Sequence, residues 1–212
     1  MEGYLTLRER AVWEQVIEKS RFIGVAYPVK TLENVQAGLE EVRDVYPGAR
    51  HYVYAYRLAE GKLEKSSDDG EPQGTGGRPV LDLLSHRQVW NVLIVVVRYF
   101  GGILLGTGGL TRAYGGTARQ LLDQARLTHL TRYVLLTLKV PYPWYERLKY
   151  QFQFKPWFIE QEDFGEVIEV KITVPQDQER EFVIWLEEFT RLKVTYLAEG
   201  VVWQAAPAER RM

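Results

Sequence analysis

Apolar and polar residues follow strand and helix patterns along the first part of the chain. Ser20–Val29 and His51–Leu58 are rich in β-branched and aromatic residues and predict strands. Between them, apolar residues recur at helical spacing, which predicts a helix over Leu32–Val45 with Thr31 as its N-cap. The run Val92–Val97 is continuously apolar, as in a strand that is buried on both faces.

Two segments beside these elements are less regular. Residues 64–79 contain many turn-forming residues and no periodicity, so we expect a loop, with Pro79 opening a short helix through Leu84. Residues 98–116 contain seven glycines in nineteen residues and lead into a helical stripe that begins at Leu110. Glycine lets the backbone reach φ > 0 and lets another group approach closely, but it costs conformational entropy on folding. The cluster therefore indicates tight packing, a ligand held against the backbone, or both.

The composition of the chain changes near residues 128–132. Sixteen of its 18 glycines precede residue 120, whereas 15 of its 27 aromatic residues lie in residues 133–212. The second part follows a β-α-β-β-α-β order, the split β-α-β or ferredoxin-like arrangement. Its elements are expected at Tyr133–Val140, Tyr142–Phe152, Trp157–Glu162, Glu166–Val174, Pro175–Phe189 and Lys193–Leu197. We therefore predict an α+β protein with two domains, residues 1–130 and 131–212.

Overall composition narrows the functional classes. Apolar residues make up 46% and charged residues 26% of the chain, as in ordinary globular proteins, and the net charge is −1. Contact with nucleic acid would therefore need a local basic patch. The chain has no cysteine, which excludes disulfides, thiolate metal sites and a cysteine nucleophile. The first twenty residues have no apolar core of a signal peptide, and no apolar run is long enough to span a bilayer, so we expect a cytoplasmic location.

The glycine cluster lacks the standard nucleotide-binding motifs. A strand, a glycine-rich loop and a helix N-terminus together favour an anion. No lysine lies between Lys65 and Lys139, so a Walker loop is excluded, and G-T-G-G-L-T does not fit the dinucleotide fingerprint. Close helix–sheet packing is the simpler explanation for Gly115 and Gly116 inside the helical stripe.

The acidic segment before the predicted short helix is a second candidate site. Asp68, Asp69 and Glu71 place three carboxylates within four residues, which could bind a hard cation or could form a solvated turn built on Asp69-Gly70. The spacing is not that of a calcium loop, so we prefer the turn. His51 lies at the start of a predicted strand. It could face a functional site, or it could equally be a structural residue at the edge of the sheet. We assign no catalytic residue, no metal and no cofactor.

Four motifs occur in order in the first part of the chain: SRFIG (20–24), HYVYAYRL (51–58), DDGEPQGTGGRPVLDLL (68–84) and NVLIVVVRYFGGILLGTGGLTRAYGG (91–116). Together they strongly resemble the YigZ/IMPACT family of cytoplasmic proteins, closely over about residues 17–125 and more loosely in the second part. The resemblance implies that the N-terminal domain is like the second domain of a small-subunit ribosomal protein, a fold shared with domain IV of elongation factor G and with galactokinase-type kinases. It implies that the C-terminal domain is ferredoxin-like and similar to domain V of elongation factor G.

The resemblance also implies a link to translation. Eukaryotic relatives regulate initiation by binding a protein activator of a starvation-responsive kinase. We therefore expect a non-enzymatic binding or regulatory protein that contacts RNA, the ribosome, a translation factor or a regulatory protein through the glycine-rich motif face, and not a membrane.

The candidate binding residues come from both motif loops, 66–79 and 99–109, which we expect to lie side by side with Arg98 and Asp69 in one network. The anion- or RNA-binding candidates are Arg78, Arg98, Gly101, Gly102, Gly106, Gly108, Gly109 and Arg112, and the acidic motif loop adds His51, Asp68, Asp69, Glu71 and Thr75. Guanidinium groups suit phosphate, and aromatic rings can stack on bases. Arg50 and Arg57 could extend the patch, with Tyr99 or Tyr114 as the stacking ring. Alternatively, each arginine pairs with a carboxylate of the acidic loop, which would neutralise the patch.

An enzymatic function is the alternative. The loops 66–79 and 99–112 could belong to a small-molecule kinase-like protein or to a metal-dependent hydrolase using His51 and the acidic loop. The kinases of this fold carry a serine pair in their phosphate loop, which G-G-I-L-L-G-T-G-G-L lacks, and likeness of fold is weak evidence for chemistry.

Overall fold

The computed structural model describes residues 3–205, so the outer ends of the two predicted domains, residues 1–2 and 206–212, lie outside it. The chain forms two compact units. One is Tyr4–His129, and the other consists mainly of the chain from Leu130 onward. Both units combine helices with an antiparallel sheet, in agreement with the predicted α+β class.

The first unit is built on a five-stranded antiparallel sheet with the order β2-β3-β6-β4-β5. Its strands are β2 (Ala11–Ile17), β3 (Ser20–Pro28), β4 (His51–Leu58), β5 (Leu63–Ser67) and β6 (Val92–Tyr99), and a short 3-10 turn, η1 (Glu60–Lys62), precedes β5. The central strand β6 is buried on both faces over Val92–Val97, which confirms the prediction from its continuous apolar run.

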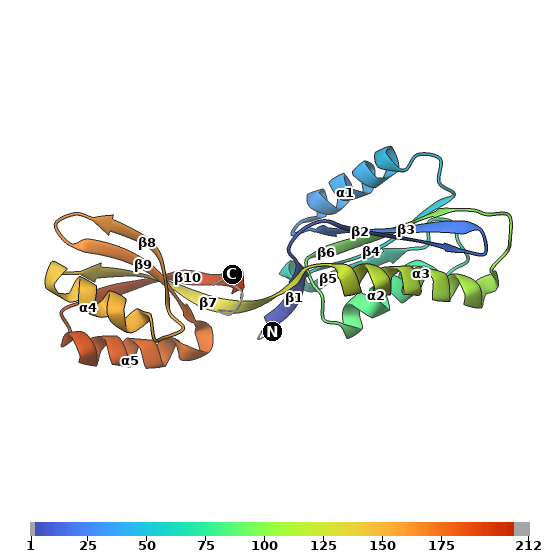
Figure 1. The fold of residues 1–212 in the computed structure, drawn as a ribbon. Helices are drawn as coiled ribbons and strands as arrows, with labels where there is room; N and C mark the ends of the chain where they lie inside the picture. The colour runs from blue at the N-terminus through green and yellow to red at the C-terminus, as the bar shows by residue number, and fades with distance from the viewer. Residues whose placement is uncertain (1–2, 206–212) are drawn as a thin grey trace. The chain divides into compact units, whose positions relative to one another are not determined.

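Helices cover both faces of this sheet (Figure 1). On one face, α1 (Leu32–Val45) packs Val35 and Val42 against the sheet, and Thr31 caps it by accepting from the Asn34 N–H at 3.3 Å. On the other face lie α2 (Gly77–His86) and α3 (Gly106–Gln124). They contribute Val80, Leu84, Leu110, Tyr114 and Leu121 to a single core with the sheet.

The second unit has the predicted order of elements. The chain runs through β7 (Leu127–Val140), α4 (Tyr142–Phe152), β8 (Phe158–Phe164), β9 (Ile168–Pro175), a short η2 (Gln176–Gln178), α5 (Glu179–Thr190) and β10 (Thr195–Ala205). Its strands are antiparallel neighbours in the order β10-β7-β9-β8, and both helices lie on one face of the sheet (Figure 1). Strand β7 crosses the division between the units at His129–Leu130. Strand β1 (Gly3–Leu7) is hydrogen-bonded to β7.

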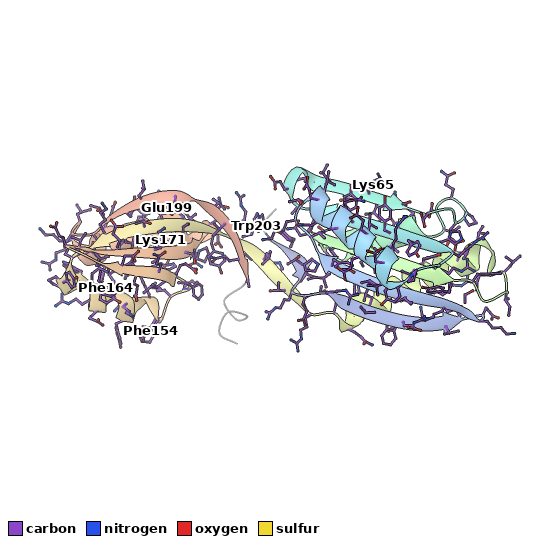
Figure 2. The ribbon with its side chains drawn as sticks, turned by 90° about the horizontal axis from the view of Figure 1, so that it is seen from above. Lys65, Phe154, Phe164, Lys171, Glu199 and Trp203 are labelled. Atoms are coloured by element: carbon purple, nitrogen blue, oxygen red, sulfur yellow. The ribbon has the colours of Figure 1, made fainter. Side chains whose placement is uncertain are left out.

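Several predicted boundaries are wrong. Residues 64–67 form part of β5 rather than a loop; this strand lies at the sheet edge, and its Lys65 is exposed (Figure 2). Residues 106–109 are the first turn of α3 rather than a loop. The last helix begins with the η2 turn, so α5 itself starts at Glu179, and β10 runs well past the predicted end at Leu197.

None of the helices within residues 3–205 is long and apolar enough to cross a membrane.

Candidate functional site

A buried network joins the two motif loops. The Nη1 of Arg98 donates to Oε1 of Glu71 at 2.6 Å, and the hydroxyl of Tyr114 donates to the same oxygen at 2.7 Å. The side chains of Glu71 and Arg98 are only 4% and 6% exposed. One carboxylate oxygen therefore connects the acidic loop, the end of β6 and the middle of α3. The loops lie together as expected, but through Glu71 rather than through Asp69.

This network keeps Tyr114 protonated. Burial disfavours the phenolate, and the hydrogen bond and negative charge of Glu71 act in the same direction. The pKa of Tyr114 is therefore raised far above its usual range. Tyr114 serves as a neutral donor inside the core, so it is not positioned to stack on a base.

Arg98 is held on several sides. Its Nη2 lies 3.5 Å from Oγ of Ser20, and its guanidinium lies 5.5 Å from the ring centres of both Phe22 and Phe100. Its Nε has no hydrogen-bond partner among the described residues. Because Glu71 balances the charge of Arg98, this arginine is not the free cation that a simple phosphate site would need.

The other two carboxylates of the acidic loop build the loop itself. Asp68 accepts from the backbone N–H groups of Gly74, Gly76 and Gly77 at 2.7–2.9 Å, and so it caps the start of α2. Partial burial alone would raise the pKa of Asp68, but these three donors hold it below its usual range. Asp69 accepts from the Tyr52 N–H at 2.7 Å.

The rest of the loop is equally self-contained. The Thr75 hydroxyl donates to the Pro72 carbonyl at 2.7 Å. No group of three His, Asp or Glu side chains within residues 3–205 is placed to hold a metal ion. The segment is thus a turn, as preferred from its sequence, and its geometry gives no support to a metal-dependent hydrolase.

His51 has a fixed orientation beside this network. Its Nδ1 lies 2.7 Å from the Asp69 carbonyl oxygen, which only a protonated nitrogen can satisfy. The Nε2 atom then points toward Glu71, 3.8 Å from Oε1. The ring forms part of the wall of a groove, with its side chain mostly buried.

That groove has a volume of about 1020 Å³ and lies beside the glycine cluster. Its lining comes from three segments, within residues 48–51, 71–72 and 98–110. Arg50, His51 and Arg98 supply nitrogen atoms, while Phe100 and Leu104 supply apolar surface. Pockets that combine apolar walls with a few convergent polar groups are the usual places for ligands.

Most glycines of the cluster have a structural reason. A Cβ at Gly101 would lie 2.0 Å from the carbonyl carbon of Lys19, so only glycine fits there. Gly102 and Gly106 have φ angles of +87° and +65°, which favour glycine. A Cβ at Gly109 would lie 3.0 Å from Cβ of Leu105, a tight contact.

Gly108 has no such reason, and the close packing expected at Gly115 and Gly116 is not found either, since a Cβ there would come no closer than 3.5 Å to Pro79 and 4.0 Å to Gln15. A Cβ at Gly108 would meet only the end of the Arg112 side chain, at 3.5 Å, and φ is not positive. Gly108 lies in the first turn of α3, which has no side-chain cap and no acidic residue. Glycine costs about 1 kcal/mol relative to alanine inside a helix. Gly108 is exposed and follows Gly106 and Thr107, which line the groove where the N-terminal amides of α3 lack intrahelical partners.

Comparisons with known proteins agree along most of the chain. Residues 18–122 match the Impact N-terminal domain, and residues 138–191 match a domain of unknown function, DUF1949. The chain is 37% identical to the IMPACT family member YigZ of Escherichia coli over 206 residues, which cover 93% of this chain and 98% of that protein. It is 31% identical to the IMPACT family member YvyE of Bacillus subtilis over 209 residues, covering 95% and 96%.

The chain belongs to the IMPACT family. A crystal structure described as that of an hypothetical protein shares 34% identity with this IMPACT family member and a TM-score of 0.62, covering 93% of this chain and 98% of the other. Protein IMPACT of Rattus norvegicus is 35% identical over 117 residues, which cover 52% of this chain and 36% of the rat protein.

The other arginines that the sequence suggested as ligands in this IMPACT family member do not gather at the groove. Arg78 is exposed on α2 and pairs with Asp82 at 2.7 Å, outside the groove lining. Arg112 lies in the second turn of α3, because the helix begins at Gly106 and not at Leu110. Arg57 is buried and structural: it pairs with Glu64 at 2.8 Å and lies 3.7 Å from the Trp90 ring centre.

Sequence reasoning missed the apolar part of the groove. Phe100 and Leu104 lie in the connection between β6 and α3, and both remain exposed. Large apolar residues inside a glycine-rich connection, where no strand or helix can bury them, are the signal that could have identified this surface.

Proposed function

We propose that this IMPACT family member is a non-enzymatic, translation-associated protein that binds RNA through the groove beside α3. The link to translation is the one that the resemblance of the sequence motifs implies, and the chain's membership of the IMPACT family supports it. The observation that carries the proposal is Gly108, a glycine without a packing reason at the uncapped start of a helix.

The charge distribution around the groove supports an anionic ligand. The start of a helix concentrates unsatisfied N–H groups and the positive end of the helix dipole. No acidic residue lies in the first turn of α3 to neutralise it, and Arg50 lines the groove without an ion pair to a carboxylate among residues 3–205. Glu71, the acidic residue of the lining, is already paired with Arg98. An RNA phosphate placed here would therefore meet donors.

The predicted likeness of the two units to domains IV and V of elongation factor G belongs to the same proposal. A pair of domains of that kind would suit contact with the translation apparatus. RNA is the ligand we favour over a protein because Arg50 and the first amides of α3 are hydrogen-bond donors, which phosphate oxygens satisfy.

Binding of a short labelled RNA at increasing salt concentration tests the proposal. The wild type should bind at low salt, and its affinity should fall steeply as salt rises, since phosphate contacts release counterions. Gly108→Val adds a branched side chain in the first turn of α3, next to the groove residues Gly106 and Thr107, and should weaken binding by about tenfold or more. Gly116→Val makes the same change on the same helix, where a Cβ would come no closer than 4.0 Å to the Gln15 side chain, and serves as the control.

Two results would overturn the proposal: no binding of RNA by the wild type at low salt, or normal binding by a folded Gly108→Val variant. Thermal unfolding of each variant shows whether it is folded.

A further inference from the structure

The connection between β6 and α3 carries apolar side chains that the fold does not cover. Phe100 is 48% exposed and Leu104 is 87% exposed, and both line the groove. Ile103, between them in sequence, is exposed as well. Exposed apolar groups gathered at the rim of a groove mark an interaction site.

Phe100 is held firmly at its base. The guanidinium of Arg98 lies 5.5 Å from its ring centre, and Arg98 is itself fixed by Glu71. The next residue, Gly101, packs directly against the backbone of Lys19, and its N–H donates to Oγ of Ser20 at 3.1 Å. Phe100 is therefore an aromatic ring that is half exposed but attached to a fixed backbone.

A buried donor beside this ring has no acceptor. The Nε of Arg98 makes no hydrogen bond within residues 3–205, although its side chain is 94% buried and lines the groove. Buried N–H groups almost always have a partner. This Nε has almost no exposed surface, so a ligand in the groove does not reach it, and the donors at the groove are Arg50 and the first amides of α3.

We propose that the groove selects single-stranded RNA, with an unpaired base stacked on Phe100 and a neighbouring phosphate at the start of α3. This inference rests on the proposed function. The flat faces of the bases are covered in a duplex and are available only in unpaired nucleotides, which is why aromatic side chains recognise single strands. Leu104 extends the apolar surface on which such a base would lie.

The polar part of the groove favours this ligand over an apolar peptide segment. Arg50 and the α3 amides are donors, and an apolar peptide would bury them without acceptors. A nucleotide offers both of the required features next to each other, a flat apolar face and phosphate oxygens.

Affinities of the full chain for a single-stranded RNA and for a blunt-ended duplex of the same composition, which has no unpaired nucleotide, test the inference. The wild type should prefer the single strand. Phe100→Ala should weaken single-strand binding roughly five- to hundredfold, the loss expected for one stacked base, and should leave duplex binding and the salt dependence unchanged. Phe100→Trp should retain single-strand binding. A fluorescent base analogue in the RNA should be quenched by the wild type and not by Phe100→Ala.

Phe154→Ala is the matched control, because Phe154 is another exposed phenylalanine, 67% exposed in the second unit and outside the groove (Figure 2). It should bind like the wild type. Equal affinity of the wild type for single-stranded and duplex RNA, or an equal loss on both with Phe100→Ala, would overturn the stacking inference and leave the proposed function standing. Absence of RNA binding by the wild type would instead remove the proposed function itself.

Discussion

Glu71 and Arg98 form a buried ion pair across 27 residues of sequence, with 2.6 Å between Oε1 and Nη1. The pair joins the acidic loop to the end of the central strand β6. Since Tyr114 donates to the same oxygen, the pair is also attached to α3. These contacts fix the wall of the groove from three separate segments of the chain.

Breaking this pair should destabilise the first unit strongly. Glu71→Gln and Arg98→Met should each lower the free energy of unfolding by about 3–5 kcal/mol, because each leaves a buried group without its partner. The double variant should lose less than the sum of the two, since the second change removes the group left unpaired by the first. Urea unfolding measures all three values. Asp82→Asn removes the exposed pair with Arg78 and should cost less than about 1 kcal/mol. Strict additivity of the two buried changes would contradict a shared network.

Substitution by alanine should have opposite effects on stability at two glycines of the cluster. Gly101→Ala should destabilise the protein by about 2 kcal/mol or more, because its Cβ would collide with the backbone of Lys19, which cannot move away cheaply. Gly108→Ala should be neutral or should stabilise by up to about 1 kcal/mol, since the space is open and alanine favours the helix. Thermal unfolding of both variants checks the contrast. Similar effects at the two positions would show that Gly108 has a packing role after all.

Asp68 should make the protein sensitive to acid. Its pKa in the folded state lies below the usual value of 3.8, so the ionised carboxylate stabilises the fold fully above pH 3.8. That contribution is lost as the pH falls through the lower, folded-state pKa. Asp68→Asn, whose amide group would face the Gly74 N–H, should cost about 1 kcal/mol at neutral pH, and the difference from the wild type should shrink in acid.

Unfolding of the wild type and Asp68→Asn across a pH series tests this. Asp44→Asn changes an exposed aspartate on α1 and provides the comparison. A difference between the wild type and Asp68→Asn that stays constant from neutral to strongly acidic pH would argue against the role of the charge.

The second unit should fold without the first. It has its own core, in which Phe182 of α5 and Leu148 of α4 pack on Leu136 and Ile172 of the sheet. Residues 131–212 alone should therefore unfold cooperatively in urea, and residues 127–212, which keep β7 whole, should be at least as stable. Gradual unfolding and rapid proteolysis of both fragments would show that the unit depends on the rest of the chain.

Local signals explain which parts of the fold could be predicted from the sequence. Helix α1 was predicted over its whole length because Thr31 caps it locally and its apolar spacing is regular. Strand β5 was missed because an edge strand pairs on one side only and needs no buried face; its side chains are all exposed or half-exposed. The start of α3 was missed because glycine is a poor helix former, and the packing of residues further along the helix outweighs that weakness.

The site could be predicted only in outline. The motifs indicated that the two loops meet. Asp68, Asp69 and Glu71 are chemically alike, however, and differ only in where their side chains point. Backbone geometry decides between them: Asp69 and Gly70 have φ angles of +45° and +86°, and the resulting turn sends Glu71 alone into the core. No spacing rule on a single sequence contains that information.

The shared acceptor has a consequence for the evolutionary record. Because one oxygen of Glu71 serves both Arg98 and Tyr114, these three positions should be inherited as a unit. A lineage that replaces Glu71 with an uncharged residue should replace Arg98 as well, since the lone guanidinium would be left buried without a counter-charge. Substitutions at positions 71 and 98 in related chains should therefore arise together far more often than separately.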